Sequence, residues 1–425
     1  MRRPIRWSPV RRLIILVFLA FLATTGNAAA SSTARMGIQD DAWLRWGPGT
    51  LDERLHTLDA LGVKTVRFTL LWSEVATRKP AAPASPGDPA YDWSQFDPVL
   101  HGLHTHGITP VITLYGSPRW ANGGRGPNYL PRSGFGAFAY AASKRYPWVR
   151  LWTIWNEPNT RVFSVPVSPA LYTQRLLNTA YVWLHTANRA NVVAGGVTSP
   201  RKTPSGMSPI DFMRGMHSAH AKLDAYAANP YPSSRLETPN WSPCAECATL
   251  TMARLADLRS LVTRTFGPKP LWLTEYGYQT NPPDRILGVS PARQAEYIGE
   301  AAFKVWRTPG VTMLIQFLVR DEPTLGGWQS GLFTKTGVAK PSRRAFSLPL
   351  AQQSRTVLWG QVRPGSGRRT YAIERWTGRR WVTVGGVRRT GDGGTFRTVV
   401  HVPQGTKVRL FAPQLGYESP LLVMS

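Results

Sequence analysis

The sequence contains only two cysteines among its 425 residues, Cys244 and Cys247, in the segment SPCAECAT. This scarcity excludes a fold held together by several disulfides. A structural zinc site would need two further ligands, and none lies nearby in the sequence. A CxxC redox centre is an alternative, but the context typical of thioredoxin is missing. In an oxidising compartment the two thiols would form a small local disulfide, and this is what we expect.

Acidic residues are also scarce. The chain has 24 Asp and Glu against 51 Lys and Arg, which gives a formal net charge of +27. A secreted protein with this charge could adhere to an anionic cell-wall polymer or an acidic glycan. The arginines are dispersed and no nucleic-acid-binding motif is present, so we expect no nucleic-acid partner. A general preference for Arg in the genome would explain the charge equally well.

Long apolar runs are missing except for one near the start, LIILVFLAFLA at 13–23. Five arginines precede this run, and the small residues Ala28, Ala29 and Ala30 follow it. This pattern predicts a secretory signal peptide over 1–30. The run is too short to span a bilayer comfortably, so an uncleaved anchor is the weaker alternative. We therefore expect a secreted, extracellular protein without a membrane span in its mature form.

From about residue 34 onward, short apolar runs alternate with polar loops and helical patterns. The runs are almost continuously apolar, as expected for parallel strands that are covered on both faces. They lie at 34–39, 65–72, 109–116, 150–157, 191–198, 223–231, 270–277 and 311–318. Eight strands alternating with helices predict a (β/α)8 TIM barrel. An open doubly wound sheet is the alternative, but no glycine-rich phosphate loop follows the first run.

The segments between the runs carry helix signals. Thr50 and Glu53 have the spacing of a capping box, and leucines follow on one face. Ser290 and Pro291 predict the start of another helix, which should end before Pro309. These signals support the alternation of strands and helices.

Near residue 350 the pattern changes to short alternating runs separated by turns such as RPGSGR and TGDGG. This predicts a small all-β, sandwich-like module. The module has twelve basic and three acidic residues. It could bind glycan or cell wall, or it could brace the barrel. We therefore predict a signal peptide at 1–30, a barrel at 31–349 and a basic β module at 350–425.

Two glutamates stand at predicted strand ends: Glu157 in WNEPN and Glu275 in TEYG. Active sites on this fold lie at the C-terminal ends of the strands. Glycoside hydrolysis needs two such carboxyl groups, one protonated to serve the leaving oxygen and one ionised to attack the anomeric carbon. Burial beside Trp155 would raise the pKa of Glu157, and Arg and Tyr neighbours would keep Glu275 ionised. The alternative, that each Glu pairs with an Arg at the rim, accounts for one of them better than for both.

These two motifs in this order resemble clan A of the glycoside hydrolases, which are retaining (β/α)8-barrel β-glycosidases, and in particular families 39 and 5. Further segments resemble the same clan: VRF at 66–68, SPRWA at 117–121, NPYP at 229–232 and GLFTKTGVAKPSRRAF at 331–346. The resemblance covers roughly residues 34 to 349. It implies a carbohydrate substrate and a covalent glycosyl-enzyme intermediate.

The resemblance also implies roles for individual residues. Glu157 would be the general acid/base and Glu275 the nucleophile. The candidate substrate-binding residues are Asn156 toward the sugar 2-hydroxyl, Arg67 and Tyr231 on the nucleophile, and Trp120 and Trp328 as sugar platforms. For the two tryptophans, packing within the protein is an equal alternative. We expect no cofactor, no metal and a monomer.

The sequence departs from the clan pattern in two places. Many relatives carry His where this chain has Asn229, and relatives often end strand eight with Trp. Here the eighth run continues as QFLVRDEP, with Gln316, Phe317 and Arg320. Both departures leave the two glutamates intact. They leave open the sugar, the linkage, endo or exo action, and the choice between families 5 and 39.

Two weaker sequence signals are better explained by structural roles than by a functional site. His101, His104 and His106 have no Cys or carboxylate partner at ligand spacing in the sequence, so a solvated helix end is a better reading than a metal site. Glu74 follows the second run, where we expect it to pair with an Arg rather than to line the cleft.

Two other functions compete with hydrolysis. A catalytically silent glycan-binding protein could use the same barrel, although binding alone does not need two facing acids. A transglycosylase would use the same residues and differ only in whether water or a sugar resolves the intermediate.

Overall fold

The computed structural model describes residues 34–244 and 248–425. The predicted signal peptide and Cys247 lie outside the described residues. Cys244 is disulfide-bonded, while its pairing with Cys247 stays a prediction. Among the described residues, no helix has the length and apolar character that crossing a membrane requires.

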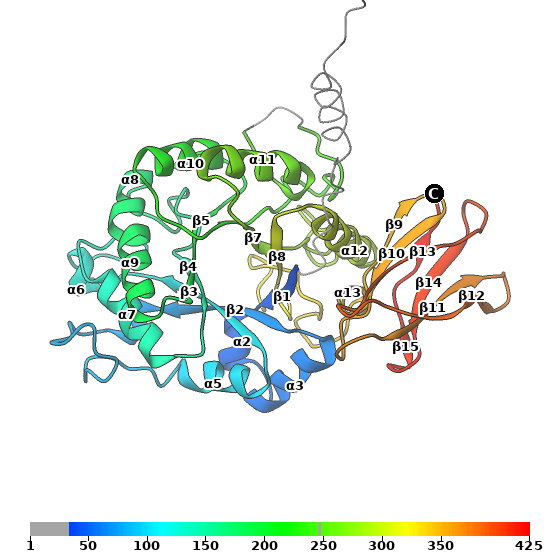
Figure 1. Cartoon of the computed structure of the whole chain (residues 1–425), viewed down its shortest axis with the longest axis horizontal. Coiled ribbons are helices and arrows are strands. Elements are labelled where there is room, and N and C mark those ends of the chain that lie inside the picture. Colours follow the sequence, from blue (N-terminus) through cyan, green and yellow to red (C-terminus); the bar gives the residue numbers. More distant parts are fainter. Residues whose placement is uncertain (1–33, 245–247) are drawn as a thin grey trace, which may run out of the picture.

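Eight parallel strands close into a barrel in sequential order (Figure 1). They are β1 (Arg35–Gln39), β2 (Thr65–Leu71), β3 (Thr109–Tyr115), β4 (Leu151–Ile154), β5 (Val192–Thr198), β6 (Ala225–Ala228), β7 (Leu271–Tyr276) and β8 (Val311–Phe317). The barrel closes where β1 pairs with β8, with Ile38 opposite Gln316. The predicted (β/α)8 barrel is therefore confirmed, and the open doubly wound sheet is wrong.

Helices surround the barrel and connect its strands. The longer ones are α3 (Leu51–Leu61), α5 (Asp97–Thr105), α7 (Phe135–Arg145), α9 (Asn178–Ala187), α10 (Pro209–Ser218), α11 (Leu255–Phe266) and α12 (Pro291–Arg307). Shorter pieces are α2 (Asp41–Trp46), α4 (Trp72–Val75), α6 (Arg119–Asn122), α8 (Pro169–Leu171), the π-helical η1 (Tyr172–Leu177), the 3₁₀ turn η2 (Met252–Arg254) and α13 (Pro341–Ser347). The predicted capping box is present, since the Thr50 hydroxyl accepts from the Glu53 backbone N–H at 3.2 Å.

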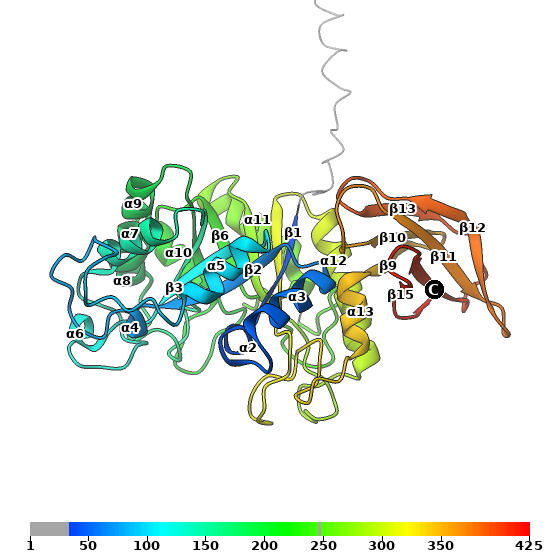
Figure 2. The same cartoon turned by 90° about the horizontal axis from the view of Figure 1, so that it is seen from below.

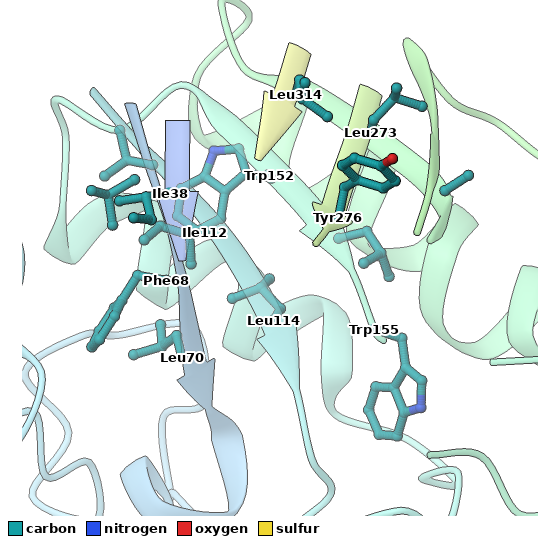
Figure 3. Packing of buried hydrophobic residues seen from close by; sticks show 14 of the residues in the cluster. Ile38, Phe68, Leu70, Ile112, Leu114, Trp152, Trp155, Leu273, Tyr276 and Leu314 are labelled. Atoms are coloured by element: carbon teal, nitrogen blue, oxygen red, sulfur yellow. The ribbon is translucent and has the colours of Figure 1, made fainter. Parts of the chain in front are cut away.

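Large apolar side chains fill the space between strands and helices. Figure 3 shows Phe68, Ile112 and Trp152 among those packed against neighbouring strands. All three are fully buried. Burying a side chain of this size stabilises the fold by roughly 1.5–3 kcal/mol. This packing holds the strand ends, and the residues that follow them, in fixed positions.

The fourth strand is shorter than predicted. The apolar run extends to Glu157, but β4 ends at Ile154. Trp155 and Glu157 both have positive φ angles, 69° and 35°, in the left-handed region that side chains other than Gly rarely adopt. The chain therefore leaves the ladder before the carboxylate and turns toward the barrel mouth. β6 likewise covers only Ala225–Ala228 of its predicted run.

The C-terminal part forms two antiparallel sheets. One has the order β13 (Thr395–Val399), β10 (Val357–Gln361), β9 (Leu350–Ser354), and the other β12 (Trp381–Arg389), β11 (Thr370–Trp376), β14 (Lys407–Ala412), β15 (Tyr417–Glu418), with β16 (Leu422–Val423) also on β14. They share a small core that includes Leu358, Ile373 and Leu410. The predicted sandwich-like fold is confirmed. Figure 2 shows these sheets beside α12 and α13, and Trp359 packs against Phe303 of α12.

Candidate active site

A cavity of about 360 Å³ opens where the barrel strands end. Gln39, at the end of β1, and Phe317, at the end of β8, both lie in its wall. Of the seven predicted catalytic and substrate-binding residues, six line this cavity: Arg67, Asn156, Glu157, Tyr231, Glu275 and Trp328. The fold thus brings together residues that are separated by up to about 260 positions in the sequence.

Glu157 owes its position to the irregular backbone after β4. The Trp155 backbone N–H donates to the Leu114 carbonyl at 2.9 Å, and the Glu157 N–H donates to the Val197 carbonyl at 3.0 Å. The buried Trp155 indole also donates to the Phe163 carbonyl at 2.7 Å. Left-handed backbone at residues other than Gly costs of order 1–3 kcal/mol each. These bonds to β3, β5 and the following loop offset that cost and fix the direction of the carboxylate.

The Glu157 carboxyl group lies in an environment that favours its neutral form. Burial, together with the nearby negative charge of Glu275, raises the pKa of Glu157 to about 7. Three groups oppose this shift: Asn229 Nδ2 donates to Glu157 Oε1 at 3.1 Å, and the positive charges of Arg67 and Arg201 favour the ionised form. The Asn229 amide is itself oriented by the Thr274 hydroxyl, which donates to Asn229 Oδ1 at 2.8 Å. Asn229 thus holds the Glu157 carboxyl group from the segment after β6.

The Glu275 carboxylate is arranged differently. It is almost completely buried, and both of its oxygens accept hydrogen bonds. Arg67 Nη1 donates to Oε1, and the Tyr231 hydroxyl donates to Oε2 at 3.1 Å. Charge-assisted bonds of this kind are stronger than neutral ones and stabilise an ionised carboxylate. Arg67 and Tyr231 therefore contact Glu275 as the resemblance implies.

Arg67 connects the two halves of the site. It is fully buried on β2, and its Nη2 donates to Asn156 Oδ1 at 2.9 Å. Its remaining donors reach Gln39 Oε1 at 2.6 Å and Thr113 Oγ1 at 2.8 Å. Because the Asn156 oxygen is occupied, its amide nitrogen is the group left to donate into the cavity. The single guanidinium thus orients both the Glu275 carboxylate and the Asn156 amide.

An aromatic wall closes one side of the cavity. Trp328 packs on Tyr231 with ring centroids 4.8 Å apart and meets the edge of Phe317 at 5.6 Å. Trp328 reaches the cavity from the loop after β8 and is held there by a hydrogen bond from its backbone N–H to Glu322 Oε2 at 2.7 Å. Its side chain remains partly exposed. Trp328 thus occupies a place where it could stack on a sugar ring.

Trp120 was the second candidate platform, and it does not line this cavity. Its indole N–H donates to the Ala76 carbonyl at 2.7 Å, and its ring packs edge to face on Trp72. These contacts match the packing alternative for Trp120, and a role as a sugar platform stays a prediction that the lining of this cavity does not support. The reason is that the turn after β3 directs the indole toward the segment after α4.

Several cavity residues were not predicted from the sequence: Gln39, Asp40, Asp41, Tyr115, Phe163, Arg201 and Glu322. Asp40 accepts from the backbone N–H groups of Val319 and Arg320, both at 3.1 Å, so it ties the end of β1 to the loop after β8. Burial raises the pKa of Asp40 to about 7. A polar pair at the end of the first strand, Gln39 as its last residue and Asp40 directly after it, was the signal that could have indicated these residues.

The weaker sequence signals are also resolved. Glu74 pairs with Arg45 at 2.7 Å, as expected, and does not line the cavity. His101 and His104 are exposed and lie against the Trp148 ring, in agreement with a solvated helix end. His106 is different, because its Nδ1 lies 2.6 Å from Asp59 Oδ2 of α3. Sequence spacing around the histidines could not reveal this acidic partner, since it comes from the preceding helix.

The fold and the cavity together define a (β/α)8 barrel with paired carboxylates at its mouth and an antiparallel β module behind it. No protein-family model matches the sequence, and no curated protein matches it.

Solved structures share the fold. A family 39 glycoside hydrolase from Bacteroides cellulosilyticus WH2 matches with a TM-score of 0.59 at 15% identity, over 88% of this chain and 82% of that one. A monomeric β-xylosidase from Caulobacter crescentus CB15 matches with a TM-score of 0.57 at 16% identity, over 86% and 94%. The GH39 enzyme from Xanthomonas axonopodis pv. citri matches with a TM-score of 0.57 at 16% identity, over 92% and 95%. The chain thus has the architecture of these glycoside hydrolases.

Proposed function

We propose that this protein is a secreted, retaining glycoside hydrolase that cleaves β-O-glycosidic bonds in an oligosaccharide or polysaccharide. One observation carries the proposal: two glutamates in a single cavity have opposite environments, Glu157 with a raised pKa and Glu275 with Arg67 and Tyr231 as donors. Two carboxyl groups whose surroundings separate their protonation states are the basis of acid and nucleophile assignments in this chemistry.

In the first step, a Glu275 oxygen attacks the anomeric carbon while the bond from that carbon to the leaving oxygen breaks. The Glu157 proton moves to the leaving oxygen, so the first product departs as a neutral alcohol. The step ends with a glycosyl ester on Glu275 and an ionised Glu157. A pKa of about 7 suits Glu157 to this role, because a group with a pKa near the working pH can both give and take a proton.

In the second step, ionised Glu157 accepts a proton from a water molecule as the water oxygen attacks the same carbon. The ester bond to Glu275 breaks, and the sugar leaves with its original anomeric configuration. Both glutamates then return to their starting states. If a sugar hydroxyl replaces the water, the same steps amount to transglycosylation.

The remaining cavity residues would bind the sugar at the reacting position. Asn156 would donate its free amide hydrogen to a hydroxyl, and the Trp328 face would stack on an apolar sugar face. The fold neighbours that are β-xylosidases support a β-glycoside substrate. The one that is described as monomeric supports a monomeric enzyme. The β module at 350–425 has more basic than acidic residues, so an anionic cell-wall polymer is a candidate partner of this module.

The proposal is tested by assaying purified residues 31–425 on a panel of aryl β-glycosides and β-glucans. We expect Glu275→Ala to be inactive and to regain activity with azide, which replaces the missing nucleophile. Glu157→Ala should lose activity mainly on substrates with poor leaving groups, since good ones need no proton. Glu74→Gln is the matched control, because its carboxylate lies outside the cavity.

Two results would contradict the assignment. A glycosyl azide of inverted configuration from Glu157→Ala, and none from Glu275→Ala, would exchange the two roles, because only a variant that lacks the nucleophile gives the inverted product. If the wild-type protein cleaves nothing on a panel that includes acidic glycans, yet binds one of them, a glycan-binding protein becomes the better description. Formation of longer oligosaccharides from the donor sugar would instead identify a transglycosylase.

A further inference from the structure

A second cavity, of about 240 Å³, lies at the opposite end of β1 from the catalytic one. Arg35 begins β1 and lines this second cavity, whereas Gln39 ends β1 and lines the first. Its wall combines the loop after α3, including Lys64, with the module segment that contains Arg363 and Arg369. The cavity is therefore a seam between the floor of the barrel and the β module, separate from the proposed catalytic groups.

The charge of this seam is entirely positive. Arg35, Lys64, Arg363 and Arg369 line it, and no described acidic residue does. None of the four forms a salt bridge with any residue that the structure describes. The neighbouring Arg368, by contrast, pairs with Asp392 at 3.0 Å. Arg35 and Lys64 are exposed, so solvent screens their charges, whereas Arg363 is buried and Arg369 is half-buried. Positive charges that gather without a counter-charge repel each other, and an anion in the cavity would relieve this repulsion.

Arg363 is the most informative member. Its side chain is only 7% exposed, and burial lowers its pKa to about 9. Its Nε donates to Gln361 Oε1 at 3.2 Å, and its guanidinium lies 4.6 Å from the centre of the Phe346 ring. Its two terminal nitrogens make no hydrogen bond to the described residues. A buried guanidinium without a carboxylate carries a desolvation cost that a neutral amide and a ring offset only in part.

Arg369 also lacks a carboxylate partner among the described residues. Its terminal nitrogens donate to the backbone carbonyls of Gly367 and Gly365, so they brace their own loop. Its Nε is buried and has no hydrogen-bond partner among the described residues. The C-terminal end of α3 near this seam contributes about half a negative charge as a helix dipole, which is less than the single positive charge of the buried Arg363.

The seam is also rigidly built. Gly62 packs so closely on the module that a Cβ there would lie 2.5 Å from the Pro364 nitrogen. The Arg363 backbone N–H donates to the Ser347 carbonyl at 3.0 Å, and the Ser347 hydroxyl donates to the Leu61 carbonyl at 3.1 Å. These contacts fix the backbone of the barrel floor against the backbone of the module at Arg363.

We propose that this cavity binds a phosphate-type oxyanion between the barrel and the module. The planar fork of a guanidinium matches the oxygens of such an anion, and Arg363, whose terminal nitrogens make no hydrogen bond to the described residues, supplies it. Arg369 contributes positive charge beside it. The anion is either free inorganic phosphate or a phosphate group carried on an anionic polymer. A bound anion would connect the barrel to the β module, because residues of both parts line the cavity.

The first test measures binding of inorganic phosphate to purified residues 31–425 by calorimetry and by thermal unfolding, with sodium chloride at matched ionic strength as reference. We expect saturable binding of phosphate and a rise in Tm that follows the same saturation. Arg363→Met should fold, because it exchanges a buried charge for an apolar side chain over Phe346. It should weaken phosphate binding at least tenfold.

Arg369→Gln is the second variant and should also weaken binding, whether or not Arg363→Met folds. Arg368→Gln is the matched control, adjacent in sequence but absent from the cavity wall, and should bind like the wild type. Equal effects of phosphate and chloride would overturn the proposal, and so would unchanged affinity in both Arg363→Met and Arg369→Gln.

A further arm separates the two sources of the anion. Polyphosphate is compared with inorganic phosphate at equal phosphate concentration, each with wild-type and Arg363→Met protein. Tighter binding of polyphosphate that Arg363→Met abolishes would identify a polymer-bound group, and equal affinity per phosphate would identify the free ion. All of these readouts are independent of glycosidase activity, so failure of one proposal does not affect the other.

Discussion

Replacing Asn229 by Asp provides a sharp test of the acid/base assignment. The Asn229 amide donates to Glu157 Oε1 at 3.1 Å, while its oxygen accepts from the Thr274 hydroxyl at 2.8 Å. Asp has nearly the same shape and can keep the bond from Thr274. The substitution therefore changes one thing at Glu157: a donor becomes a second carboxyl group.

The size of the effect follows from the distance. Two unit charges 3.1 Å apart repel by about 5 kcal/mol at an effective dielectric constant of about 20. Since about 1.4 kcal/mol corresponds to one pKa unit, the pair resists double ionisation by up to about four units. Toward Glu157, Asn229→Ala removes the donor without adding a charge, and a bond to a charged group is worth about 1.5 kcal/mol, or about one pKa unit. It also removes the acceptor of the Thr274 hydroxyl. Both changes raise the pKa, because the amide stabilises the ionised form of Glu157.

The assay is the pH dependence of kcat/KM on an aryl β-glycoside with a poor leaving group. Wild-type activity should fall as the pH rises through about 7, where Glu157 loses its proton. This basic limb should move up by about one unit in Asn229→Ala and by at least two in Asn229→Asp. Asn188→Asp, outside the cavity, should leave it in place. A basic limb that does not move in Asn229→Asp would refute the assignment of Glu157 as the acid.

Two further predictions concern the other walls of the cavity. Arg67→Lys keeps the positive charge but loses the guanidinium fork that donates to both Glu275 and Asn156. In steady-state kinetics kcat/KM should therefore fall about 10- to 100-fold, as expected for one lost charge-assisted hydrogen bond. A loss below threefold would contradict the role of Arg67. Trp328→Ala should raise KM about fivefold, since aromatic stacking contributes about 1 kcal/mol. Trp120→Ala should leave KM unchanged. An equal rise of KM in both variants would support Trp120 as a sugar platform.

The barrel could be predicted because its signal is repeated. Each strand is covered on both faces, so each appears as an almost continuous apolar run, and eight such runs alternate with helix signals. Strand ends are less certain, because an apolar residue can be buried outside a strand as well as within it. Trp155 illustrates this: it is fully buried, but as part of a turn whose indole donates to Phe163. Hydrophobicity alone assigned it to β4.

The site could be predicted only where a residue stands in a recognisable motif. Glu157 and Glu275 follow apolar runs, and the strand-end rule of the fold brings them together. Gln39, Thr113 and Asn229 orient the reacting groups through contacts made across the barrel, between residues far apart in the sequence. Their positions depend on the register between strands, for which a single sequence contains no signal.

The left-handed turn after β4 explains why Glu157 can be half-buried and yet directed into the cavity. A strand that continued through Glu157 would alternate its side chains between the barrel interior and the helices, and the carboxyl group would follow that alternation. The positive φ angles at Trp155 and Glu157 break the alternation. Trp155 then packs beneath the site and Glu157 enters the cavity. The apolar run and Glu157 therefore act together: the buried indole of Trp155 fixes the turn, and the turn directs the Glu157 carboxyl group into the cavity.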